Sequence, residues 1–330
     1  MSAPPLDQIV RKLADCRRLA ITSHLRPDGD SLSTSLAIAF TLEELGKEVA
    51  VVNKDKTPFP FVEFPDCARI MIGQIPARGF DAVILLECAD VSRSGQEGLD
   101  GYFKINIDHH YSNDFYADIN WVDPAASAVG EMALELCERL LPQVTPRIAN
   151  LLYCAIVSDT GSFQFSNTTA RAFDACHRLV LAGADPIKTS EALYHNACPG
   201  KIKLLGRVLS SLEMRADGAI AVISLFKRDL QEMNLLEVDT EDITTQARSI
   251  RGVQAVLFFK EMEPGVFRVS IRSKGDAHAA AIAEHFGGGG HAHAAGFTVV
   301  GPYENLIREV PETVARLLSS RRGPSPAPSA

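Results

Sequence analysis

Acidic and histidine side chains follow apolar runs at several points of this sequence. The triplet Asp108-His109-His110 ends the run Lys104-Ile105-Asn106-Ile107, and further acidic or histidine-bearing segments occupy residues 24–30, 87–93 and 159. In an open α/β sheet, the loops that leave the carboxyl ends of the strands meet at one edge, where ligands converge. Imidazole nitrogen and carboxylate oxygen together suit Mn²⁺, Fe²⁺ or Zn²⁺. The pattern therefore predicts an enzyme with a metal site.

A tight turn carries the first of these segments. Residues 23–31 follow the apolar stretch 19–22, and Pro27 and Gly29 favour a sharp change of direction. Such a turn would point three side chains at one small volume: His24, Asp28 and Asp30. In the simpler interpretation, the aspartates only cap a helix that begins near Leu32. Taken alone, this segment favours the cap.

Five motifs occur in the order, and at about the spacing, of the DHH/DHHA1 phosphoesterases. They are His24-x-x-x-Asp28-x-Asp30, Glu87-Cys88-Ala89-Asp90-x-x-Arg93-x-Gly95, Asp108-His109-His110, Asp159-Thr160-Gly161 and Gly287-Gly288-Gly289-Gly290-His291. The sequence resembles this family from about residue 5 to about residue 320. Within the family it resembles the branch of bifunctional oligoribonucleases (nanoRNases) and pAp phosphatases. Five ordered motifs together are a strong signal, whereas each alone is weak.

The resemblance implies two divalent metal ions that share one bridging carboxylate. The first ion would take His24, Asp28 and Glu87, and the second would take Asp30, Glu87, His109 and Asp159. The catalytic residues would be Asp108, which would orient His109, and His110, which would face the substrate phosphate or the leaving oxygen. Mn²⁺ is the expected ion, with Mg²⁺ or Co²⁺ as alternatives. Two such ions polarise a phosphoryl oxygen and lower the pKa of a water molecule between them.

Glu87 departs from the family pattern, which usually has Asp at this place. A bridging glutamate requires the strand end to retract by about 1.5 Å, the length of one C–C bond. Asp90, three residues later, is the competing candidate. We prefer Glu87 because it directly ends the apolar run 82–86.

The second half of the chain contains a glycine-rich stretch and a basic strand end. Glycines allow backbone amides to approach an anion closely, and His291 adds a further donor. The expected substrate-binding residues are Arg93, Arg272, Ser273, Gly288, Gly289, Gly290 and His291. The alternatives are a flexible linker for the glycines and a solvated strand end for Arg272.

Composition is consistent with a two-domain protein of the cytoplasm. The chain has 330 residues, of which 46% are apolar, and this length exceeds what one core usually supports. Seven cysteines lack any C-x-x-C pair and indicate a reducing compartment. We expect neither a membrane span nor an export signal. The net charge of -8 argues against binding to long nucleic acid, because such binding needs a basic face.

The apolar runs predict an α/β fold. Strands are expected at 19–23, 48–53, 81–87 and 104–107, then at 219–225, 253–260, 266–272 and 297–300. Helices are expected at 32–45 (amphipathic, closed by Gly46), 127–141, 148–158, 168–182, 187–196, 200–214 and 277–285. The alternation of strand and helix implies a mainly parallel sheet wrapped by helices in the first domain.

These elements divide the chain into four segments. Residues 1–185 would form the DHH catalytic, metal-binding domain, and 186–215 a helical connector. Residues 216–321 would form a smaller α/β DHHA1 domain that binds substrate across a cleft, and 322–330 a disordered tail.

The resemblance implies hydrolysis of short single-stranded oligonucleotides and dinucleotides to mononucleotides, and of 3'-phosphoadenosine 5'-phosphate (pAp) to AMP. A cyclic dinucleotide (c-di-AMP) or linear pApA phosphodiesterase is the main alternative. An inorganic pyrophosphatase and a larger exonuclease are disfavoured by the glycine-rich second domain and by the lack of additional domains. The alternative that is not an enzyme is a nucleotide-binding sensor that has lost its catalytic activity. Long duplexes and membranes are not expected as partners. The sequence leaves open whether the protein forms a homodimer.

Overall fold

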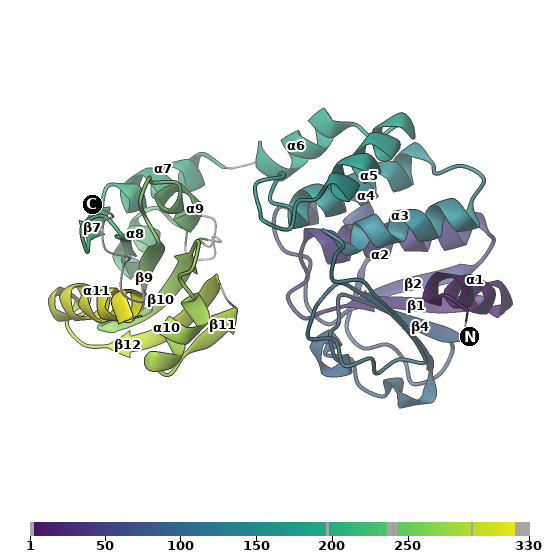
Figure 1. Cartoon of the computed structure of the whole chain (residues 1–330), viewed down its shortest axis with the longest axis horizontal. Coiled ribbons are helices and arrows are strands. Elements are labelled where there is room, and N and C mark those ends of the chain that lie inside the picture. Colours follow the sequence, from purple (N-terminus) through teal and green to yellow (C-terminus); the bar gives the residue numbers. More distant parts are fainter. Residues whose placement is uncertain (1–2, 196–197, 236–239, 241–242, 292, 321–330) are drawn as a thin grey trace, which may run out of the picture. The chain divides into compact units, whose positions relative to one another are not determined.

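The computed structural model describes residues 3–195, 198–235, 240, 243–291 and 293–320. The chain divides into two compact units, residues 1–196 and 197–330, each with its own six-stranded sheet (Figure 1). No helix among the described residues is both long and apolar enough to cross a bilayer.

The sheet of the first unit is parallel throughout. Its strands are β1 (Arg18–Ser23), β2 (Glu48–Asn53), β3 (Met71–Ile72), β4 (Ala82–Leu86), β5 (Phe103–Asp108) and β6 (Ile119–Val122). They lie in the order β3-β2-β1-β4-β5-β6. The helices are α1 (Pro5–Asp15), α2 (Gly29–Glu44), α3 (Val129–Leu140), α4 (Pro146–Asp159), α5 (Ala170–Leu181) and α6 (Pro186–Tyr194). The predicted parallel α/β architecture is confirmed.

Helix α2 differs from its prediction. We expected an amphipathic helix from residue 32, but α2 begins at Gly29 and is buried along residues 29–42. The reason is that α2 contacts both the sheet, through β1 and β2, and the helices α3 and α4. It has no solvent face over most of its length, so its sequence carries little helical periodicity. Gly46 adopts the left-handed conformation, with φ +76, just after the helix ends.

The register of three neighbouring strands brings the candidate residues to one edge. Ser23 of β1 pairs with Leu86 of β4, which in turn pairs with Ile107 of β5. The residues that follow, including His24 and Glu87, therefore leave the sheet at the same level. This edge is the carboxyl edge of the parallel sheet, as predicted.

The second unit has a mixed sheet. Its strands are β7 (Glu213–Arg215), β8 (Ile220–Leu225), β9 (Ala255–Glu263), β10 (Val266–Ser273), β11 (Gly289–His291) and β12 (Ala294–Val300), in the order β11-β12-β10-β9-β8-β7. Only the β8–β9 pair is parallel among these described strands. The helices are α7 (Pro199–Leu209), α8 (Lys227–Glu232), α9 (Ile243–Arg248), α10 (Ala279–His285) and α11 (Tyr303–Ser320).

One predicted element of this unit needs correction, and the glycine-rich stretch proves to be ordered. The helix expected at 200–214 ends at Leu209, because residues 213–215 pair with β8 as an edge strand. In the glycine stretch, Gly289 and Gly290 belong to β11, which pairs with β12, so the alternative of a flexible linker does not apply to these two residues. A Cβ atom on Gly290 would lie 2.5 Å from the carbonyl oxygen of Ala294, so this pairing needs glycine.

Candidate metal centre

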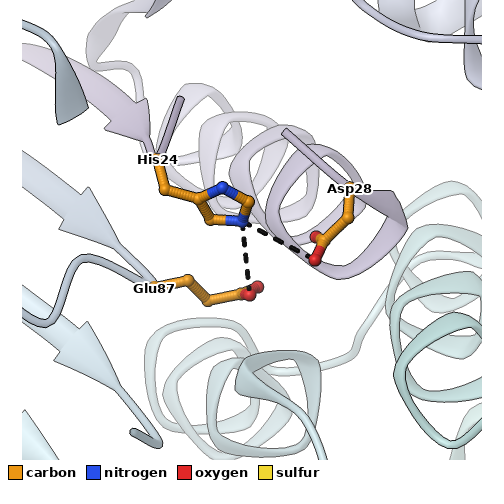
Figure 2. A group of neighbouring side chains, drawn as sticks. All are labelled: His24, Asp28 and Glu87. Carbon is orange, nitrogen blue, oxygen red and sulfur yellow. Dashed lines mark ion pairs between the residues drawn. The ribbon is translucent and has the colours of Figure 1, made fainter. Parts of the chain in front are cut away.

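Three side chains from different elements form the first group of candidate ligands. The His24 Nε2 atom lies 3.6 Å from Asp28 Oδ2 and 3.7 Å from Glu87 Oε2 (Figure 2). His24 follows β1, Glu87 follows β4, and Asp28 is the N-cap residue of α2. Asp28 accepts a hydrogen bond from the Ser31 backbone N–H, so the capping interpretation is also correct. The same turn therefore starts a helix and supplies a candidate ligand.

A second group shares Glu87 with the first. Ligand atoms of Asp30, Glu87 and His109 all lie within 4.8 Å of one another. The Asp159 Oδ2 atom lies 3.8 Å from His109 Nε2 and extends this group. The geometry thus brings together all six residues proposed as metal ligands, with Glu87 in the middle. Asp90 belongs to neither group, because it caps a short 3-10 helix and accepts from the N–H groups of Ser92 and Arg93.

The two imidazole rings are fixed by backbone carbonyl groups. The Nδ1 atom of His24 lies 2.8 Å from the Leu25 carbonyl oxygen, and that of His109 lies 3.1 Å from the Ala126 carbonyl oxygen. A carbonyl oxygen can only accept, so each Nδ1 carries the proton. In the neutral rings, the lone pair is then on Nε2, the atom that faces the carboxylates. This is the usual arrangement of a metal-binding histidine.

Asp30 is anchored to the start of α3. Its carboxylate accepts from the Val129 N–H at 2.6 Å, the Gly130 N–H at 2.9 Å and the Thr34 hydroxyl at 2.9 Å. These donors fix the direction of the side chain. The first two are amides at the start of a helix, which have no partner within the helix itself. Asp30 is buried, so the hydrogen bonds offset part of the cost of its burial.

Glu87 lacks such compensation. Its side chain is 2% exposed, and its Oε1 atom has no hydrogen-bond partner. Burial raises the pKa of Glu87 well above its usual range, and the charges of Asp28, Asp30 and Asp159 raise it further. Its φ angle of +55 is uncommon for a residue other than glycine. A buried, unsatisfied and strained carboxylate indicates a functional site.

Asp159 has a similarly perturbed carboxyl group. Burial and the negative charge of Asp30 raise the pKa of Asp159 to about 7. The raised pKa values of Glu87 and Asp159 reflect the cost of placing several negative charges in so small a buried volume, and positive charge would remove this cost. The residues present therefore fit divalent cations in number, chemical type and orientation.

Asp108 orients a different ring from the one expected. The prediction had it orient His109, but its Oδ1 atom lies 2.7 Å from the His110 Nδ1 atom and also accepts from the His110 backbone N–H. The ring of His109 uses the Ala126 carbonyl instead. The oxygens of Asp108 have other donors, because Oδ1 also accepts from the His109 backbone N–H at 2.8 Å and Oδ2 accepts from Asn113 at 2.6 Å. His110 is the more exposed partner, with 34% of its side chain accessible.

Two asparagines complete the site and were not found from the sequence. Asn113 holds Asp108, as described above. The Asn167 side-chain amide donates to the Asp159 carboxylate at 3.3 Å and to the Asp159 carbonyl at 3.1 Å. Both follow a candidate motif by only a few residues, but asparagine is common in turns, so no signal set them apart.

Arg93 lies close to the first group of ligands. Its carbonyl oxygen accepts from the Leu25 N–H at 2.7 Å, which ties the loop after β4 to the loop after β1. Burial lowers the pKa of His24, but the hydrogen bond and charge of Asp28, with the Leu25 carbonyl, raise it overall; the positive charge of Arg93 has a smaller lowering effect.

The remaining candidate residues lie in the second unit. Arg272 and Ser273 end β10, and Ser273 is buried. The Ser273 hydroxyl donates to the Ala277 carbonyl and lies 3.2 Å from the His293 Nδ1 atom. Gly288 is held against β12, where a Cβ atom would come within 2.2 Å of the Gly296 carbonyl oxygen. The side chain of His291 lies outside the described part of the chain.

Comparisons with known proteins show the family of this chain. Models of the DHH family N-terminal domain and of the DHHA1 domain match residues 18–156 and 235–320. The chain is 31% identical over 301 residues to the bifunctional oligoribonuclease and PAP phosphatase NrnA of Thermus thermophilus, which covers 90% of each chain. It is 26% identical over 301 residues to the protein of the same name from Bacillus subtilis, covering 88% of this chain and 92% of the other.

A solved structure has the same fold over nearly the whole chain. The crystal structure of an exopolyphosphatase-related protein from Bacteroides fragilis matches with a TM-score of 0.86 and 23% identity, covering 96% of this chain and 97% of the other. The resemblance stated from the five motifs is thereby confirmed.

Proposed function

Because this chain belongs to the DHH family and carries a DHHA1 domain, we propose that it hydrolyses phosphoester bonds in short oligoribonucleotides and in pAp. The observation that carries the proposal is the position of Glu87 in both groups of candidate ligands. A shared carboxylate between two such groups is the arrangement that two-metal hydrolysis needs. The similarity to NrnA proteins supports the choice of substrates.

The proposed ligands divide between two divalent ions. His24, Asp28 and Glu87 would hold one ion, and Asp30, Glu87, His109 and Asp159 would hold the other. When bound, the ions would polarise a phosphoryl oxygen and make a nearby water molecule more acidic. Mn²⁺ suits the mixture of imidazole and carboxylate better than Mg²⁺, which prefers an all-oxygen shell.

The residues around the ligands have separate proposed roles. Asp108 holds the Nδ1 atom of His110, so the Nε2 atom is left for the substrate phosphate or the leaving oxygen. Asn113 and Asn167 keep Asp108 and Asp159 in position. Arg93, next to His24, is a candidate contact for the substrate.

Substrate binding beyond the scissile phosphate is proposed for the second unit. Arg272 can form two hydrogen bonds to one phosphate, and Ser273, Gly288, Gly289, Gly290 and His291 would complete the contacts. The net charge of -8 favours short substrates over long duplexes. Six of the seven cysteines are buried and all are unpaired, which supports a cytoplasmic location.

One assay panel tests the proposal. Purified protein is given di- to pentaribonucleotides, pAp and cyclic di-AMP, each with Mn²⁺, with Mg²⁺ or after metal removal. We expect turnover of dinucleotides and pAp with Mn²⁺ and none without metal. Faster cleavage of cyclic di-AMP than of any linear substrate would assign the protein to the alternative phosphodiesterase class. Binding without turnover on every substrate would indicate a sensor.

A further inference from the structure

The loop that follows His110 carries two unusually exposed aromatic side chains. Tyr111 is 91% exposed and Phe115 is 64% exposed, and no other phenylalanine, tyrosine or tryptophan of the described residues is exposed as much. A single exposed ring is ordinary on a protein surface. Two such rings within five residues of a proposed catalytic histidine indicate a binding role.

Tyr111 stands at the corner of a turn that begins at His110. The His110 carbonyl oxygen accepts from the Asn113 N–H at 3.3 Å, so Tyr111 and Ser112 are the central residues of this turn. The Cα atoms of His110 and Tyr111 are neighbours in the chain, about 3.8 Å apart. A tyrosine that is 91% exposed presents both faces of its ring to solvent. It can therefore accept a flat partner from either side.

The backbone of Phe115 is held in an uncommon conformation by the same side chain that positions Asp108. Its φ angle is +54, in the left-handed region that a bulky residue rarely adopts. The Asn113 side-chain oxygen accepts from the Phe115 N–H at 2.8 Å, and its amide nitrogen donates to Asp108 at 2.6 Å. The Asn120 amide donates to the Phe115 carbonyl oxygen at 3.2 Å. A single asparagine thus ties the position of Phe115 to the carboxylate that orients His110.

The rest of this loop is anchored to the sheet. The Asp114 N–H donates to the Ala89 carbonyl oxygen at 2.8 Å, which joins the loop after β5 to the loop after β4. Tyr116 packs against a buried apolar cluster of the same unit. The two exposed rings therefore belong to a fixed loop, which lowers the entropic cost of binding a ligand. A strained residue held in this way is typical of a ligand site.

We propose that Tyr111 and Phe115 bind the base of a nucleotide that flanks the scissile phosphate, by stacking. This inference rests on the proposed function, because it assigns further substrate contacts at the same site. The phosphate lies at the metal ligands and His110, and the adjoining base lies on the two rings. Every base has a flat face, so stacking tolerates any of the four bases. Hydrolysis of short RNA of mixed sequence requires this tolerance.

Fluorescence titration of the full chain tests this inference without any need for turnover. The probe is the 5'-monophosphate of 2-aminopurine riboside, whose emission falls when its base stacks on an aromatic ring, and Mg²⁺ is present throughout. We expect a saturable loss of emission with wild type. Tyr111→Ala should weaken binding about tenfold and Phe115→Ala about fivefold, as expected for the loss of one stacking partner.

Substitutions at one position separate stacking from simple apolar contact. Tyr111→Phe keeps the ring and should bind the probe like wild type. Tyr111→Leu keeps an apolar side chain without a flat face and should bind like Tyr111→Ala. The inference is overturned if wild type shows no saturable loss of emission, if Tyr111→Leu binds like wild type, or if Tyr111→Ala and Phe115→Ala both do.

Kinetics on dinucleotides distinguish this inference from the proposed function. Tyr111→Ala should raise KM about tenfold and leave kcat within about twofold, because the ring binds substrate and transition state alike. With one of the two dinucleotides that lack a single base, wild type and Tyr111→Ala should have equal kcat/KM, since the partner of the ring is missing. Stacking of the probe without cleavage of any dinucleotide would refute the proposed hydrolysis alone. Cleavage with unchanged KM in Tyr111→Ala would refute the stacking role alone.

Discussion

Carboxylates occupy both edges of the parallel sheet in the first unit, but in opposite conditions. At the amino edge, Asp81 accepts from the backbone N–H groups of Arg17 and Arg18, at 2.7 and 2.8 Å. These bonds hold the pKa of Asp81 below its usual range. At the carboxyl edge, Glu87 is buried with an unpaired oxygen and a raised pKa.

The difference teaches how one side-chain type serves two purposes in one sheet. The carboxylate at the amino edge is exposed and accepts two backbone hydrogen bonds, so it stabilises the fold in its charged form. The carboxylate at the carboxyl edge is strained and poorly satisfied, so it destabilises the metal-free fold. The carboxylate at the amino edge therefore stabilises the sheet, whereas the group at the carboxyl edge is suited to binding cations.

The largest expected effect comes from removing the paired histidines of the carboxyl edge. His109→Ala with His110→Ala should lower hydrolysis of dinucleotides by on the order of 10³-fold or more, because a candidate ligand and a phosphate contact are lost together. Circular dichroism should show a folded protein. His177→Ala, at an exposed position of α5, is the control and should retain activity. Near wild-type turnover in the double variant would reject the site.

Glu87 tests whether one carboxylate serves both groups. Glu87→Gln should lose at least one bound metal, measured by mass spectrometry of the metal content, because a neutral amide is a poor bridge between cations. Glu87→Asp should keep measurable activity and can shift the preferred metal. Asp90→Asn is the control. If Asp90→Asn lost metal while Glu87→Gln kept it, the assignment of the bridging residue would be wrong.

The second unit tests whether the chemistry is confined to the carboxyl edge. Arg272→Ala and His291→Ala should each lower kcat/KM for dinucleotides and pAp by about ten- to a hundredfold, as expected for a charge-assisted contact of about 1.5–3 kcal/mol. Cleavage of bis-p-nitrophenyl phosphate should be spared, because this ester lacks the second nucleotide. An equal loss on both substrates would place these residues in the chemical step.

Metal addition should reverse the instability of the carboxyl edge. Wild-type protein freed of metal should melt at a lower temperature than the same protein with Mn²⁺, and Mn²⁺ at a hundred times its Kd should add about 2.7 kcal/mol. Metal-free Glu87→Gln should melt above metal-free wild type at a pH where Glu87 is ionised, because the amide avoids the cost that burial and the nearby carboxylates impose on that charge. An identical melting temperature for wild type with and without Mn²⁺ would contradict this prediction.

The smallest expected effect concerns the amino edge and pH. A lowered pKa in the folded state means that Asp81 stabilises the fold above the unfolded value of about 3.9, and that this contribution disappears as pH falls through the lower, folded value. The urea midpoints of wild type and Asp81→Asn should therefore differ at pH 6 and converge in strong acid. Asp100→Asn, an exposed control, should match wild type throughout. A constant gap down to pH 2 would contradict the prediction.

The sequence was a good guide to strand ends because two signals coincide there. An apolar run marks each buried strand, and the polar residue after it marks the edge, as at His24, Glu87 and His109. Contacts that depend on side-chain direction were not predictable. Whether Asp108 holds one imidazole ring or the other depends on rotamers that spacing alone does not determine. The pairing of the glycine stretch with β12 was not predictable either, because glycine rarely favours a strand and tertiary packing overrides that preference.

The burial of α2 links the lifetime of a bound ion to the stability of the whole unit. The candidate ligand Asp30 lies in the first turn of this helix, which is buried along residues 29–42, and Asp28 precedes the helix as its N-cap residue. Backbone amides in such an element exchange with solvent only when the unit unfolds globally. Fraying of loops therefore does not carry Asp30 away from the site.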